Sequence, residues 1–202
     1  MAFEEDIYSL PDDWGSTTLG ELCDSGGGDI QTGPFGSQLH SADYVLVGVP
    51  SIMPTNILVE GVQAEGIARI TPQDAERLRK YLVRPGDIVY SRRGDVEKCA
   101  LITAKEDGWL CGTGCLRVRT GKASINSDFL HAYLSSPPVR AWVVRHSVGA
   151  TMPNLNTGIL KPLYSHLQLP AALLPHGPSG DLLRTNIGPH IRCPGNWFLS
   201  RL

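Results

Sequence analysis

The feature that most constrains the fold is a turn that leads directly into a short buried strand. Pro85-Gly86-Asp87 turns the chain, and the apolar and β-branched run Ile88-Val89-Tyr90-Ser91 follows at once. A second strand is predicted over Cys115–Arg119, where apolar residues alternate with Arg117 and Arg119. One face of that strand is expected to pack, while the other presents two guanidinium groups. The pattern favours a sheet built from short strands.

The remaining segments predict further short elements on both sides of this pair. A loop is expected over the glycine-rich residues 23–38, and Thr71 is expected to cap a helix that begins at Pro72. Other predicted elements are a strand over 44–53 broken at Pro50, a hairpin within 56–70, a strand over 100–103, a helix over 129–135 stopped by Pro137-Pro138, and a helix over 139–147. The expected fold class is α+β, with a twisted, largely antiparallel sheet and short flanking helices.

Composition bounds the kind of protein and its organisation. The chain has 202 residues, 42% of them hydrophobic, and a net charge of −2, which excludes disorder of the whole chain. It contains no window of about 18 consecutive apolar residues, and its first residues are acidic where an export signal would be basic. We therefore expect a cytoplasmic protein with an acidic arm (1–13), one domain (14–168) and a poorly ordered tail (169–202).

Charge is segregated along the chain. Residues 1–68 contain 11 acidic residues and no Lys or Arg, whereas all 18 basic residues fall within 69–202, against 9 acidic ones. Twelve of the basic residues lie between Arg69 and Lys122. Such segregation suits a chain that presents one face to a polyanion while the rest stays soluble.

Signatures of catalysis and of metal binding are missing. The sequence has no Gly-x-Ser-x-Gly motif, no methyltransferase cofactor loop and no paired acids around a Glu-x-Lys. Cys111-Gly-Thr-Gly-Cys115 has two interpretations, half of a zinc site or two small buried residues, and no second Cys or His pair lies at ligand spacing. Reduced thiols are expected, and an enzyme that uses a Cys thiolate is the catalytic rival. The balance favours a binding module that is not an enzyme.

Three segments, in this order, resemble the target recognition domain of the specificity subunit of type I restriction-modification systems. They are Trp14–Leu22 with Thr32–Leu39, then Val83–Gly94, and finally Asp128–Asn156 with its closing Gly-x-Thr-x-x-x-Leu turn. Together these segments span about residues 14–165. The order and the spacing make the resemblance more specific than any one motif.

The resemblance implies sequence-specific binding of double-stranded DNA, by a domain that reads one half of a bipartite target. It implies methylation and restriction subunits as partners, with S-adenosylmethionine bound by the methylation subunit and no cofactor or metal on this chain. A family member would continue after Leu169-Pro170 into a long spacer helix, and residues 171–202 lack that pattern. We therefore expect a truncated half-subunit, with a homodimer of such halves as one possible assembly. The alternative is an orphan half-subunit that acts through contact with a specificity or methylation subunit.

Arginine and glycine residues supply the candidate contacts to DNA. Arg92 and Arg93 beside Gly94 suit guanine edges and phosphates, with an internal ion pair to Asp87 or Asp95 as the alternative. The Gly33–Ser37 loop offers backbone N–H groups, or else forms an internal turn with its phenylalanine in the core. The full set of candidate DNA-binding residues is Thr32, Gly33, Phe35, Gly36, Ser37, Arg92, Arg93, Gly94, Arg117, Arg119, Arg145, Thr151 and Asn154.

Overall fold

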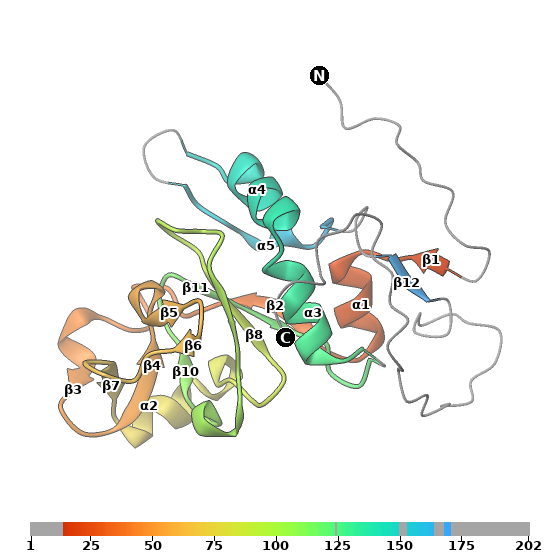
Figure 1. Ribbon diagram of the computed structural model, residues 1–202. Coiled ribbons are helices and arrows are strands. Elements are labelled where there is room, and N and C mark those ends of the chain that lie inside the picture. Colours follow the sequence, from red (N-terminus) through yellow and green to blue (C-terminus); the bar gives the residue numbers. More distant parts are fainter. Residues whose placement is uncertain (1–13, 124, 150–152, 164–167, 171–202) are drawn as a thin grey trace.

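The computed structural model describes residues 14–123, 125–149, 153–163 and 168–170 (Figure 1). The predicted acidic arm and residues 171–202 of the predicted tail lie outside the described residues. The helices are α1 (Leu19–Ser25), α2 (Pro72–Arg77), α3 (Ser127–Leu134), α4 (Pro137–His146) and α5 (Thr157–Leu160), with single-turn helices η1 (Ser41–Asp43), η2 (Pro54–Asn56), η3 (Arg79–Tyr81) and η4 (Ala104–Glu106). The strands are β1 (Trp14–Ser16), β2 (Asp29–Thr32), β3 (Tyr44–Val45), β4 (Val49–Ile52), β5 (Ile57–Leu58), β6 (Gly61–Val62), β7 (Ala68–Ile70), β8 (Ile88–Ser91), β9 (Cys99–Leu101), β10 (Leu110–Cys111), β11 (Cys115–Arg119) and β12 (Gln168–Pro170).

A four-stranded antiparallel sheet in the order β2-β11-β8-β9 forms the centre of the molecule. Helices cover one of its faces, where Tyr90 and Leu116 pack with Leu22 of α1 and Leu130 of α3. The other face packs on residues of the second sheet, so β8 is buried along its whole length. Burial on both faces explains why Ile88, Val89 and Tyr90 form a continuous apolar run rather than an alternating pattern.

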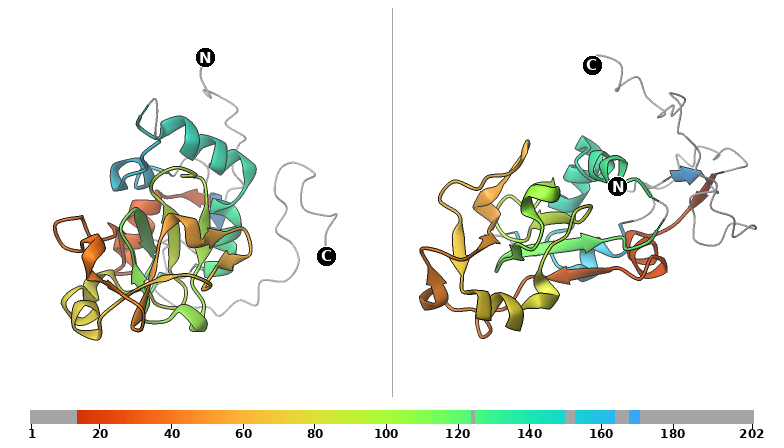
Figure 2. Two further views of the ribbon diagram at one scale, coloured as in Figure 1. Left: turned by 90° about the vertical axis from the view of Figure 1, so that its left-hand side faces the viewer. Right: turned by 90° about the horizontal axis from the view of Figure 1, so that it is seen from below.

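The second sheet has the order β10-β4-β7-β3 and lies beside α2 on the left of Figure 1. Its strands are two to four residues long, and one pair, β10 with β4, is parallel. A separate two-stranded pair joins β1 to β12, and Figure 2 places this pair away from both large sheets. The expected fold class, α+β with largely antiparallel sheets and short helices, is confirmed.

Local sequence signals placed several elements correctly. The Thr71 side chain accepts a hydrogen bond from the Asp74 N–H at the start of α2, as its position before Pro72 predicts. Gly86 has φ +90° in the turn before β8, and both β8 and β11 have the predicted bounds. A positive φ is accessible to glycine at little cost, which is why this turn depends on that residue.

Three predictions about elements are wrong, each for a local reason. The segment predicted as a loop contains β2, which is a strand because it pairs with β11. Pro50 lies inside β4 and does not break it, since the short partner β10 pairs only with Ser51 and Ile52 beyond it. Pro137-Pro138 begins α4, where the first turn needs no N–H donors, and Ser135 instead caps the C-terminus of α3.

Candidate nucleic-acid interface

Strand direction in the central sheet brings three loops to one edge. Because β2 and β8 both run antiparallel to β11, the two strands end at the edge where β11 begins. Residues 33–37 follow β2, residues 92–98 follow β8, and residues 112–114 precede β11. The Gly33 N–H donates to Cys115 O, and the Thr113 hydroxyl donates to Pro34 O, so these loops are hydrogen-bonded to one another. We call this set of loops, with residues 145–149 and 153–154, the recognition edge.

Arg92 is held at the recognition edge by its main chain. Its N–H donates to Gly114 O at 2.8 Å, and its carbonyl accepts from Leu155 N at 2.9 Å. Its side chain lies between two neighbours: Nε donates to Asn154 Oδ1 at 3.2 Å, and the guanidinium carbon is 5.9 Å from the centre of the Phe35 ring. The hydrogen bond to Asn154 and the contact with the Phe35 ring together fix the orientation of the Arg92 guanidinium.

Electrostatics distinguishes Arg92 from its neighbour. Partial burial, and then the charge of Arg93, lower the pKa of the Arg92 guanidinium from its ordinary value. Arg93 is exposed, and within the described part of the chain its guanidinium has no hydrogen-bond or ion-pair partner. Gly94 is exposed with φ +74° and has open space where a Cβ would lie. Arg92 and Arg93 therefore place two positive charges beside the exposed backbone of Gly94.

The internal ion pairs considered for these arginines do not form. Asp87 accepts hydrogen bonds from Arg119 instead, at 2.8 and 2.6 Å. Asp95 pairs with Lys98 within the same loop, at 2.5 Å. Neither Asp87 nor Asp95 therefore neutralises the charge of Arg92 or Arg93 at the recognition edge.

The Gly33–Ser37 loop divides into a buried start and an exposed tip. Thr32 is the half-buried last residue of β2, and a Cβ on Gly33 would lie 2.0 Å from Gly112 O, so the chain accepts only glycine there. The Gly33 N–H is used by Cys115 O and is not open to a phosphate, which corrects that part of the prediction. Phe35 is 54% exposed and does not enter the core, so the internal-turn alternative is also wrong.

The exposed tip of this loop carries the donors that remain. Gly36 and Ser37 are exposed, and within the described residues their backbone N–H groups donate to no protein acceptor. The ends of the turn are fixed, because Gln38 N and Leu39 N both donate to Phe35 O. Two free N–H groups and a serine hydroxyl on a fixed turn can bind a phosphate oxygen.

A third part of the recognition edge is the bridge between Val148 and Asn154, after α4. Val148 and Asn154 exchange two backbone hydrogen bonds, at 3.2 and 2.9 Å, and Asn154 also bridges to Arg93. Arg145 is exposed in the last turn of α4, three residues before Val148, which is 63% exposed. Thr151 lies outside the described residues.

Arg117 and Arg119 do not belong to the recognition edge, contrary to the prediction. Arg117 is only 2% exposed, and its guanidinium donates to Asp29 at 2.6 Å and to the carbonyls of Lys80 and Leu82. Arg119 is fixed by Asp87 and also donates to Leu82 O. The arginine face of β11 is covered by the segment around η3, so these residues stabilise the interior of the fold.

No chemistry of metals or thiols is visible in the described part of the chain. Cys23, Cys99, Cys111 and Cys115 are all buried free thiols. Burial raises the pKa of both Cys23 and Cys111 to about 12, which keeps these thiols protonated at neutral pH. Among the described residues no group of three His, Cys, Asp or Glu side chains could hold a metal ion. Within the described part of the chain, no helix has the length and the apolar character needed to cross a membrane.

Comparison with known proteins gives a match in structure but not in sequence. No family model matches this chain, and none of the curated proteins matches it. One similar structure comes from work on complex assembly and conformational transition of a type I restriction-modification system, with TM-score 0.55 and 22% identity. Another is the HsdS subunit from Thermoanaerobacter tengcongensis, with TM-score 0.52 and 18% identity. Each match covers 82% of this chain, but only 36% and 40% of the other chains.

These likenesses define the class of fold. The chain folds like a part, about two fifths or less, of proteins from type I restriction-modification systems. The resemblance to the target recognition domain of a specificity subunit is thereby confirmed at the level of the fold. Identities of 22% and 18% say nothing about which residues act, so the role of the recognition edge depends on its own geometry.

Proposed function

We propose that this chain is the target recognition domain of a type I specificity subunit and binds double-stranded DNA in a sequence-specific manner. The observation that carries the proposal is the convergence of Arg92, Arg93, the Gly36–Ser37 turn and Asn154 at one edge of the sheet. Arginine pairs well with guanine O6 and N7 in the major groove, and exposed backbone N–H groups suit phosphates. The domain would read one half of a bipartite target and would catalyse nothing itself.

Within this edge Arg93 and Arg92 have different roles. Arg93 is exposed, and within the described residues its side chain has no protein partner, so it is the one that contacts a base edge. Arg92 is held by Asn154 and Phe35, so it presents a fixed positive charge to the phosphate backbone. This division also agrees with β geometry, because adjacent residues of an extended chain point to opposite sides.

The proposed partners follow from the class of fold. Methylation and restriction subunits would assemble with the chain in the cytoplasm, and S-adenosylmethionine would bind the methylation subunit. A homodimer would join two halves of a recognition unit. The alternative role, contact with a specificity or methylation subunit without DNA reading, predicts a complex on size exclusion with a methylation subunit and no selected DNA site.

Selection from random duplex DNA tests the proposal, followed by competition against every single-base variant of the selected site. Arg93→Ala should weaken binding of the selected site by roughly 1–3 kcal/mol and relax selectivity at one position. Arg92→Ala should weaken all sequences alike and reduce the slope of log affinity against log salt by about one unit.

Lys105→Ala is the matched control, because Lys105 is an exposed cation on η4, outside the recognition edge. It should retain the affinity and the selectivity of the parent chain. Failure of the selection to enrich any sequence, or unchanged binding by both arginine variants, would overturn the proposal.

A further inference from the structure

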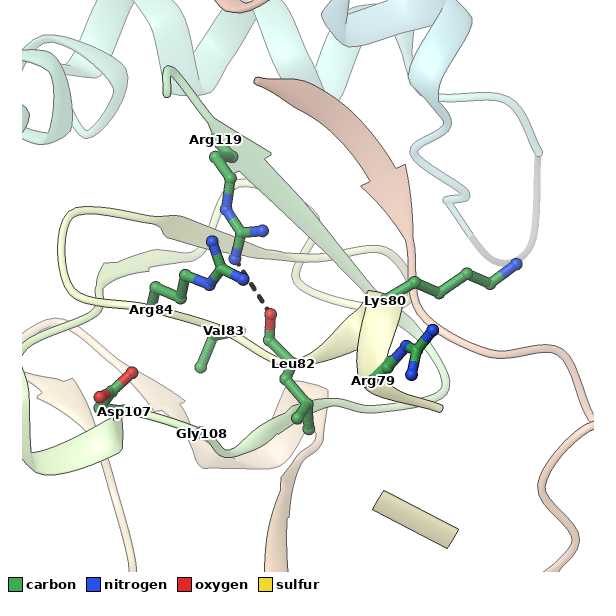
Figure 3. Close-up of a pocket in the computed structure, with 8 residues that line it drawn as sticks. All are labelled: Arg79, Lys80, Leu82, Val83, Arg84, Asp107, Gly108 and Arg119. Atoms are coloured by element: carbon green, nitrogen blue, oxygen red, sulfur yellow. Dashed lines mark hydrogen bonds between the residues drawn. The ribbon is translucent and has the colours of Figure 1, made fainter. Parts of the chain in front are cut away.

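The edge of the central sheet opposite the recognition edge carries a second cluster of positive charge. Strand direction places the start of β2, the start of β8 and the end of β11 together there. Two neighbouring pockets, of about 400 and 380 Å³, open at this edge, and Arg84 and Arg119 line both of them. Figure 3 shows the larger pocket, into which these two side chains extend toward one another from β11 and from the segment before β8.

Cations dominate the walls of both pockets. Arg79 and Lys80 add to the larger pocket, and Lys122 adds to the smaller one, where the Ser127 side chain also lies. Asp107 and Asp87 are the carboxylates among the lining residues of the two pockets. Asp87 binds Arg119 and balances its charge, and Arg79 pairs with Glu76 at 3.0 Å. The net positive charge of the two pockets therefore comes from Arg84, Lys80 and Lys122.

Arg119 provides a rigid floor that both pockets share. The Asp87 carboxylate accepts from both its Nε and its Nη2, and this hydrogen bonding raises the pKa of the guanidinium. A third hydrogen bond, from Nη2 to Leu82 O at 3.0 Å, fixes the plane of the group (Figure 3). A guanidinium held in one orientation loses little entropy when an anion binds.

Among the described residues Arg84 is a pocket cation without an ion pair. Its backbone N–H donates to Asp87 Oδ2, which fixes the start of the side chain. The side chain is exposed, and in the described part of the chain its guanidinium makes no hydrogen bond or ion pair. Its positive charge is therefore available to an anion that enters the pocket.

We propose that Arg84 and Arg119 form a phosphate-binding site, with Arg79, Lys80 and Lys122 at its rim. Arginine binds phosphate oxygens through two parallel N–H donors. Those of Arg84 are unused within the described residues, whereas Nε and Nη2 of Arg119 already donate to Asp87, so Arg84 makes the main contact and Arg119 forms the wall behind it. The phosphate belongs either to the backbone of a nucleic acid or to a free phosphate compound, and the chemistry of the site is the same for both. The site is separate from the recognition edge and does not read sequence.

Titration with pyrophosphate and with duplex DNA distinguishes the two sources. Pyrophosphate should perturb the amide NMR signals of Arg84, Gly86, Asp87 and residues 119–122 in the full chain. Arg84→Gln should weaken this binding about tenfold. If the backbone of DNA is the natural source, Arg84→Gln should also weaken all duplex sequences equally and reduce the salt slope by about one unit. If a free phosphate compound is the source, binding of duplex DNA should be unchanged.

Lys161→Gln is the control, because it removes an exposed cation that lines neither pocket. It should behave like the parent chain in both titrations. Equal responses of the parent chain and Arg84→Gln in both titrations would overturn the phosphate site. The pyrophosphate titration needs no selected DNA site, so failure of the proposed function and failure of this site are distinguishable.

Discussion

Removing one partner of the buried ion pair between Asp87 and Arg119 is expected to destabilise the fold strongly, because the other charge is then left buried and unpaired. Asp87 is 3% exposed and accepts three hydrogen bonds, two from Arg119 and one from Arg84 N at 2.8 Å. Asp87→Asn removes the negative charge and places an amide donor against the guanidinium. Breaking a buried pair on one side costs about 3–5 kcal/mol. Since the Arg119 side chain is 19% exposed, water relieves part of this cost, and we expect about 3 kcal/mol.

Urea unfolding measures this loss directly. The midpoint should fall while the denaturant slope stays constant, as expected when stability changes without a change in exposed surface. For a domain of this size, about 3 kcal/mol corresponds to a decrease of roughly 6–12 °C in the thermal midpoint.

Asp95→Asn is the matched control for this prediction. It breaks the pair with Lys98, whose two side chains are 62% and 35% exposed. An exposed pair contributes about 1 kcal/mol or less, so this variant should stay close to the parent chain. Equal small losses in Asp87→Asn and Asp95→Asn would refute the reasoning, because the buried pair would then contribute no more than a surface pair.

Three further predictions test other parts of the structure. Gly33→Ala should cost roughly 1–3 kcal/mol in urea unfolding, because its Cβ would lie 2.0 Å from Gly112 O, whereas Gly36→Ala meets open space and should change little. Mass spectrometry after treatment with iodoacetamide at pH 8 should find the four described cysteines unmodified until denaturant is added. Above about pH 9 the free energy of unfolding should fall, because the thiols of the unfolded chain ionise while the raised pKa values of Cys23 and Cys111 keep these thiols protonated in the folded chain. Removal of residues 171–202, which lack apolar periodicity, should shift the thermal midpoint by only a few degrees.

Sequence reasoning succeeded where the signal is contained in a few neighbouring residues. The turn before β8 needs a glycine with positive φ, and the helix α2 needs an oxygen before its first turn, so Gly86 and Thr71 mark these boundaries. It failed for β2, which is polar and four residues long and forms a strand because it pairs with β11. Pairing with a strand 84 to 90 residues away leaves no local trace.

The same distinction applies to the candidate site. Alternation along β11 correctly placed Arg117 and Arg119 on the face opposite Leu116 and Val118. It did not show whether that face meets water, because the covering residues around η3 and the partner Asp29 lie far away in sequence. Arg84 was missed although it lies within the motif that leads into β8. Its significance depends on a pocket that forms only when three strand ends meet.

The recognition edge is held together mainly by main-chain atoms. Arg92 N to Gly114 O, Leu155 N to Arg92 O and Gly33 N to Cys115 O connect the loops without using any side chain. The frame therefore imposes few demands on the identity of the exposed residues, such as Arg93 and Ser37, that it displays. New side chains at these positions can change what the edge contacts while the loops keep their shape. A few substitutions on such a surface can change its binding preference without destabilising the fold.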